Sequence, residues 1–152
     1  MPEGSRGAHA LDTSVAAQYV RGVSAYERVA VDAPPDAVVS ALRESLRSRA
    51  ITEYAVVDHG RDMAAAGAPG FVAWTLVFGN PAAGAKLLER DVAAAVDIPL
   101  RLAVIAAGSG GSEIVLRDMR SLLSDDLADL ADAFTDVLRA LAADARDRAT
   151  TR

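Results

Sequence analysis

The chain of 152 residues contains no cysteine, and this absence excludes several kinds of site. Without thiols, the chain cannot form a disulfide, bind zinc through cysteine, hold an iron–sulfur cluster or use a cysteine nucleophile. Lysine is almost absent as well, since Lys86 stands alone beside 15 arginines. Aromatic residues make up only 5% of the chain. The core must therefore consist mainly of Val, Leu, Ile and Ala.

Long apolar runs and an excess of positive charge are missing too. No apolar segment approaches the roughly 18 residues that span a membrane, and the first residues lack the charged and apolar regions of a secretory signal. The formal net charge of −5 argues against general nucleic-acid binding. We therefore expect a cytoplasmic protein that acts without nucleic acid or membrane.

Composition divides the chain into three parts, of which one is a domain of ordinary length. Residues 1–24 are interrupted by Gly and Ser and are otherwise rich in Ala, so they predict a flexible N-terminal arm, with a short helix over 12–20 as the alternative. Residues 25–143 alternate between strand and helix periodicity and form the expected domain. Residues 144–152 are predicted to fray at the end of the last helix.

Hydrophobic periodicity within the domain predicts the order β-α-β-α-β-α-β-β-α. The third strand, over 71–78, is nearly all apolar and is predicted to be central and buried on both faces. The glycine-rich segment 108–112 predicts a hairpin turn between the last two strands. The expected fold is α+β, with a single sheet of about five strands covered by helices.

The segment Phe78-Gly79-Asn80-Pro81-Ala82-Ala83-Gly84 ends the third strand and opens a helix. Asn80 can cap that helix with its side chain, and the proline after it suits the first helical position. Free N–H groups at a helix start attract anions, Gly84 permits the close approach of a ligand, and Lys86 adds a positive charge. The turn predicts either an anion site that includes Gly79 or a purely structural cap.

Two further polar positions lie beside predicted strand ends. His59, next to Asp58, has the chemistry of a general acid or base, and the alternative is a turn histidine that bonds to the backbone. Arg101 can bind a carboxylate or phosphate through two hydrogen bonds, or it can pair with Asp91 or Asp97. Acidic residues alone would have to complete a metal site, so we expect no metal and no cofactor.

Three segments together resemble a known family. Asp58-His59 follows the second strand, the Phe-Gly-Asn-Pro turn with its trailing Gly84 follows the third, and Asp97-Ile98-Pro99-Leu100-Arg101 enters the fourth. Over about 26–141 the sequence is similar to DUF302, a family of domains of unknown function in small bacterial proteins. The resemblance implies a compact α+β domain and a homodimer, and it implies no established reaction. Here Ile98 replaces the usual leucine, and 114–118 lacks an aromatic residue common in the family.

These observations leave three functions open. The first is a small-molecule binding module, whose pocket joins His59, Asn80, Gly84 and Arg101 at one end of the sheet and takes an anionic or carbonyl-bearing ligand. The second is an enzyme in which His59 transfers a proton and the turn from Gly79 to Gly84 stabilises an anion. The third is a non-catalytic dimeric scaffold. We favour the binding module.

Overall fold

The computed structural model describes residues 26–151. The predicted N-terminal arm and its alternative helix lie outside these residues. One sheet contains β1 (Tyr26–Val31), β2 (Thr52–Asp58), β3 (Ala73–Gly79), β4 (Leu100–Ala106) and β5 (Ser112–Arg117). The helices are α2 (Pro35–Ser48), α3 (His59–Ala65), α4 (Pro81–Arg90) and α5 (Ala128–Thr150). Short 3-10 turns are η1 (Val92–Asp97), η2 (Gly108–Gly110), η3 (Met119–Ser121) and η4 (Asp125–Leu127). This order confirms the predicted α+β fold.

The strands lie in the order β1-β5-β4-β3-β2, and each neighbouring pair is antiparallel. From β2 to β5, each strand pairs with the next one along the chain, whereas β1 joins the far edge beside β5. The central strand is therefore β4, and β2 and β1 form the two edges.

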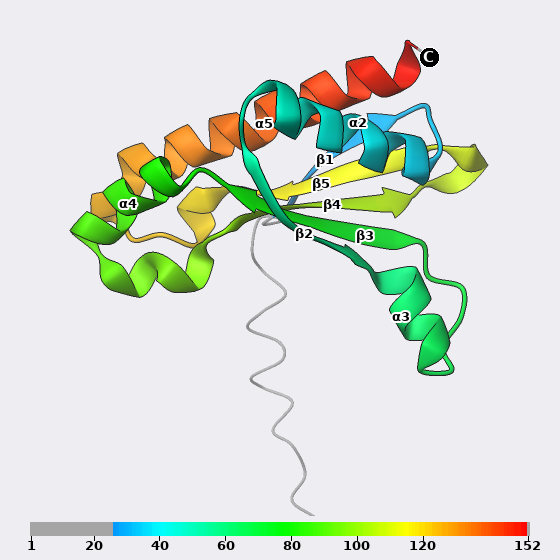
Figure 1. The fold of residues 1–152 in the computed structure, drawn as a ribbon, viewed down its shortest axis with the longest axis horizontal. Helices are drawn as coiled ribbons and strands as arrows, with labels where there is room; N and C mark the ends of the chain where they lie inside the picture. Colours follow the sequence, from blue (N-terminus) through cyan, green and yellow to red (C-terminus); the bar gives the residue numbers. More distant parts are fainter. Residues whose placement is uncertain (1–25, 152) are drawn as a thin grey trace, which may run out of the picture.

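Helices α2 and α5 lie together on one side of the sheet (Figure 1). Alternate strand side chains point toward these helices, and β4 buries Leu100, Leu102 and Val104 on that face. None of the described helices forms a matching layer on the other face. The structure has no helix long and apolar enough to cross a membrane within residues 26–151.

The prediction that 71–78 is a central strand buried on both faces is wrong. Phe71 and Val72 precede β3 and are 59% and 45% exposed. Within β3, only Leu76 and Phe78 are fully buried, because they face the helix layer. A continuous apolar run does not distinguish a strand covered on both faces from one whose second face is partly open.

Helix α5 is longer than the sequence predicted. The expected fraying over 144–152 is contradicted up to Thr150, where the helix ends. Ala145 and Ala149 are buried, and Arg148 forms an ion pair with Glu44 of α2 at 3.4 Å. The buried stripe of α5 continues with alanines instead of leucines, and this change in side-chain size concealed it.

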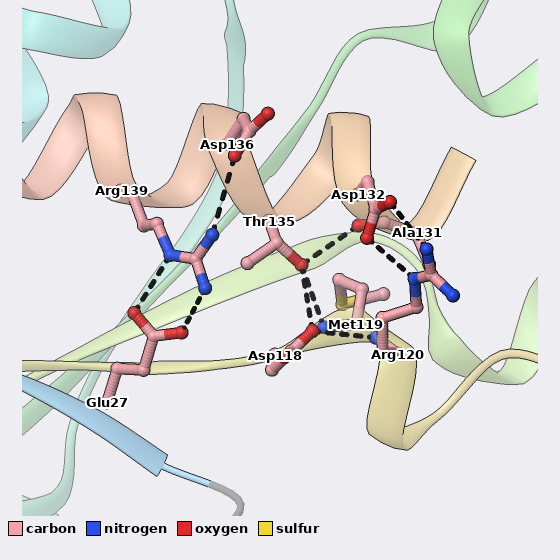
Figure 2. A network of polar contacts seen from close by, with 9 residues as sticks. All are labelled: Glu27, Asp118, Met119, Arg120, Ala131, Asp132, Thr135, Asp136 and Arg139. Carbon is pink, nitrogen blue, oxygen red and sulfur yellow. Dashed lines mark hydrogen bonds and ion pairs between the residues drawn. The ribbon is translucent and has the colours of Figure 1, made fainter. Parts of the chain in front are cut away.

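A polar network fastens α5 to the segment that follows β5 (Figure 2). The hydroxyl of Thr135 accepts the N–H of Met119 at 2.9 Å and donates to the carbonyl of Ala131 at 2.9 Å. Thr135 is buried, so no water replaces these partners. Ion pairs extend the network on the surface, where Arg139 holds Glu27 of β1.

Candidate functional site

A cavity of about 400 Å³ lies where β3 ends and α4 begins, and we call it the turn cavity. The turn from Gly79 to Gly84 forms one wall. Ile98 and Pro99, which enter β4, form a second wall, and Phe134 and Val137 of α5 form a third. Arg49, Ile51 and Tyr54 complete the lining, so four separate parts of the chain meet around a space that is mostly apolar.

The side chain of Asn80 caps α4. Its Oδ1 atom accepts the N–H of Ala82 at 2.9 Å, and its backbone carbonyl accepts the N–H of Gly84 at 2.9 Å. This is the structural alternative that the sequence offered for the turn. The cap therefore satisfies the N–H groups of Ala82 and Gly84 within the protein.

The two glycines of the turn leave room in the cavity wall. A Cβ atom on Gly79 would lie 3.4 Å from Cε2 of Tyr54, and one on Gly84 would lie 3.6 Å from Cδ1 of Ile98. Both neighbours also line the turn cavity. Larger side chains at these two positions would therefore reduce the volume of the turn cavity.

The cation of the turn cavity is Arg49, which sequence reasoning did not single out. Arg49 follows the end of α2 and lines the cavity. Within the described residues its side chain forms no hydrogen bond and no salt bridge, although its charge, after Ser45 and Arg148, helps to lower the pKa of Asp144 on α5. Lys86, the predicted cation, is exposed on α4 and does not line the cavity. No sequence pattern marks Arg49, because its position depends on how α2 packs.

His59 and Asp58 lie at the opposite end of β3 from the turn. Asp58 pairs with Trp74, whereas Gly79 pairs with Thr52. A strand rises about 3.4 Å per residue, so the two ends are roughly 17 Å apart. Figure 1 likewise shows α3 and α4 at opposite ends of the sheet. The expected pocket that joins His59 with Asn80 at one end of the sheet is therefore wrong.

The local contacts of these two residues are well defined. Asp58 caps α3 by accepting the N–H of Arg61 at 2.9 Å. His59 begins α3, and its Nε2 atom lies 2.8 Å from Oγ1 of Thr75 on β3. His59 thus bonds to a side chain, not to the backbone, and the turn cannot stabilise an anion on which His59 acts.

Arg101 lies in a second cavity, of about 290 Å³, between β4 and β5; we call it the strand cavity. Thr75, Asp97 and Arg117 also line it. Within the described residues, Arg101 forms no ion pair with Asp91 or Asp97. Arg101 therefore lines the strand cavity, whereas Asn80 and Gly84, with which the sequence grouped it, line the turn cavity.

Metal chemistry finds no support in the part of the chain that the structure describes. Over residues 26–151, no group of three His, Asp or Glu side chains could hold a metal ion. Arginine and apolar side chains line both cavities.

Comparisons with known proteins identify a family and a fold. A crystal structure of an uncharacterized conserved DUF302 protein from Bacillus stearothermophilus is similar to this chain with a TM-score of 0.75 and 18% sequence identity. The similarity covers 82% of this chain and 100% of that one. A search of curated proteins finds no match. Residues 27–146 match the family model of DUF302, a domain of unknown function, and with that match over most of its length the chain belongs to the DUF302 family.

Proposed function

We propose that this protein binds a small molecule with an apolar body and one acidic group in the turn cavity. The observation that carries the proposal is a cavity of about 400 Å³ with mostly apolar walls and an arginine that forms no salt bridge within the described residues. Its volume falls within the range of about 300–1,000 Å³ that is usual for small-molecule sites.

The walls of the turn cavity favour an apolar body. Phe78 and Leu100 come from the buried face of the sheet, and Phe134 comes from α5. Tyr54 and Val137 are large apolar side chains that are 52% and 38% exposed, and a bound ligand would cover them. Each buried methylene group of a ligand contributes about 0.8 kcal/mol.

Arg49 selects the acidic group. A guanidinium group can hold a carboxylate through two parallel hydrogen bonds. Arg49 forms no salt bridge with the described acidic residues, although its charge, after Ser45 and Arg148, helps to lower the pKa of Asp144 on α5. A ligand carboxylate would therefore compete only with this longer-range attraction. A ligand without the acidic group would keep the apolar contacts and lose this one.

The proposal is tested by calorimetric titration with octanoate and octanol, which share a chain length and differ in charge. We expect octanoate to bind the wild type more tightly than octanol does. Arg49→Gln should weaken octanoate about tenfold, since a hydrogen bond to a charged group contributes roughly 1.5–3 kcal/mol, and should leave octanol unchanged. Arg47→Gln is the matched control, because Arg47 is exposed on α2 and lines neither cavity.

Two results would contradict the proposal. One is that neither octanoate nor octanol binds the wild type over the same range of concentrations. The other is an octanoate affinity that Arg49→Gln and Arg47→Gln reduce equally, because the charge would then act from a distance and not within the turn cavity.

A further inference from the structure

Strands β4 and β5 separate at one end of the sheet. They pair from Ala106 with Ser112 to Ala103 with Val115. Beyond this point β4 remains paired with β3 as far as Leu100, and β5 remains paired with β1 as far as Arg117. The strand cavity lies in the opening between them, since residues from the unpaired stretches of both strands line it.

Two arginines face this opening from opposite strands. Arg101 and Arg117 each lie two residues beyond the last pair, Ala103 with Val115, and therefore project from the same face of the sheet. Both line the strand cavity. An anion between the two strands would therefore meet a positively charged group from each side.

The arginine side chains of this protein are otherwise mostly ion-paired. Eight arginines form salt bridges with Asp or Glu within the described residues. Arg101 and Arg117 do not. Arg117 instead donates to the hydroxyl of Tyr26 at 2.9 Å and lies 5.0 Å from the centre of its ring. This contact orients the Arg117 guanidinium but does not neutralise its charge.

Acidic residues near the strand cavity do not neutralise the two arginines either. Asp118 follows Arg117 directly, but its Oδ1 atom accepts the N–H of Arg120 at 2.9 Å and lies 3.3 Å from the hydroxyl of Thr135 (Figure 2). Asp97 lines the cavity, yet within the described residues it forms no ion pair with Arg101 or Arg117. The lining thus carries two positive charges against one negative charge.

We propose that the strand cavity binds a small dianion of the phosphate monoester or dicarboxylate class between Arg101 and Arg117. A guanidinium group can hold an oxyanion through paired hydrogen bonds, and Arg117 keeps N–H groups for this beyond the one that it donates to Tyr26. The hydroxyls of Tyr26 and Thr75 lie in the same lining and add neutral hydrogen-bonding groups. His59 reaches this site only through Thr75, at 2.8 Å from its Oγ1 atom. The site is separate from the turn cavity and does not depend on the proposed function.

The test is calorimetric titration of the full chain with inorganic phosphate and with succinate at constant ionic strength, with acetate as the monoanion for comparison. We expect at least one dianion to bind at one per chain and more tightly than acetate. Arg101→Gln and Arg117→Gln should each weaken that binding at least tenfold. Arg47→Gln should leave it unchanged, and so should Arg49→Gln, because Arg49 lines the turn cavity.

Each outcome of this test counts for or against the site. Binding of phosphate alone identifies the monoester class, binding of succinate alone identifies the dicarboxylate class, and binding of both supports the shared dianion chemistry. The proposal is overturned if neither dianion binds more tightly than acetate, or if Arg101→Gln binds as the wild type does. Arg101 is exposed, and its side chain forms no hydrogen bond or ion pair within the described residues. Its variant should therefore keep the wild-type melting temperature without anion and remains informative even if Arg117→Gln fails to fold.

Discussion

Gly84 lies both inside α4 and in the wall of the turn cavity, so Gly84→Ala separates stability from ligand binding. The added Cβ atom would lie 3.6 Å from Cδ1 of Ile98, which is an ordinary van der Waals contact. Alanine is favoured over glycine within a helix by about 0.5–1 kcal/mol. For a domain of this size, the melting temperature should therefore rise by about 2–4 °C.

Ligand binding should change in the opposite direction. The new methyl group occupies space between α4 and Ile98, and a ligand that loses one buried methylene there loses about 0.8 kcal/mol. Octanoate affinity should therefore fall about fourfold. Thermal unfolding without ligand and calorimetric titration with octanoate measure the two effects on the same preparation.

Gly108→Ala provides the control, because a Cβ atom on Gly108 would meet nothing within 4 Å and Gly108 lines neither cavity. Its octanoate affinity should equal that of the wild type. A lower melting temperature for Gly84→Ala would show that Ile98 does not accommodate the methyl group. A higher melting temperature with unchanged octanoate affinity would show that the ligand does not use this wall.

Three further predictions concern stability and are measured by urea or thermal unfolding. Asn80→Ala should lower the free energy of unfolding by about 1 kcal/mol through loss of the helix cap, whereas Asn80→Asp should retain the cap, and equal losses would contradict the assigned capping role. Thr135→Val should cost about 1–3 kcal/mol, because the buried N–H of Met119 loses its acceptor; an unchanged stability would show that another group accepts that N–H. The hydrogen bond from Arg139 lowers the pKa of Glu27, so this pair contributes stability above about pH 4 and loses it as the pH falls further. The difference in melting temperature between wild type and Glu27→Gln should therefore shrink between pH 7 and pH 3, and a constant difference would contradict the pairing.

The order of the secondary structure was predictable because local signals determine it. Asn80 followed by Pro81 marks the start of α4, and the alternating segment from Tyr26 marks β1. These signals act over a few residues and do not require knowledge of the partners. The same signals predicted the last helix but not where it ends. The burial of Ala145 and Ala149 depends on packing against α2, which the sequence does not show.

The candidate site was less predictable because its residues meet across the sheet. His59 and Asn80 each follow a strand, and in parallel strands such positions would lie at one edge. Since β2 and β3 are antiparallel, the residues that follow them lie at opposite ends. The predicted grouping of His59 with Asn80 was wrong because the sequence does not show the relative direction of neighbouring strands.

The positions of Arg101 and Arg117 in the strand cavity follow in part from a turn that the sequence predicted. Segment 108–112 was correctly predicted as a turn, and a hairpin centred on Ser109 places these two arginines opposite one another. The sequence did not show which residue of the turn lies at its centre, and this residue determines the register of β4 and β5. Arg49 is a different case, because only the packing of α2 brings it to the turn cavity.

The position of β1 at the edge beside β5 has a consequence for the order in which the chain can fold. Tyr26 and Arg117 are 91 residues apart in sequence, and β1 pairs with β5 alone. During synthesis β2, β3 and β4 can each pair with the strand that is made next, whereas β1 has its partner only after β5 has been made. Contacts of such long separation slow folding, and a chain that ends before Ser112 lacks the strand with which β1 pairs in the complete sheet.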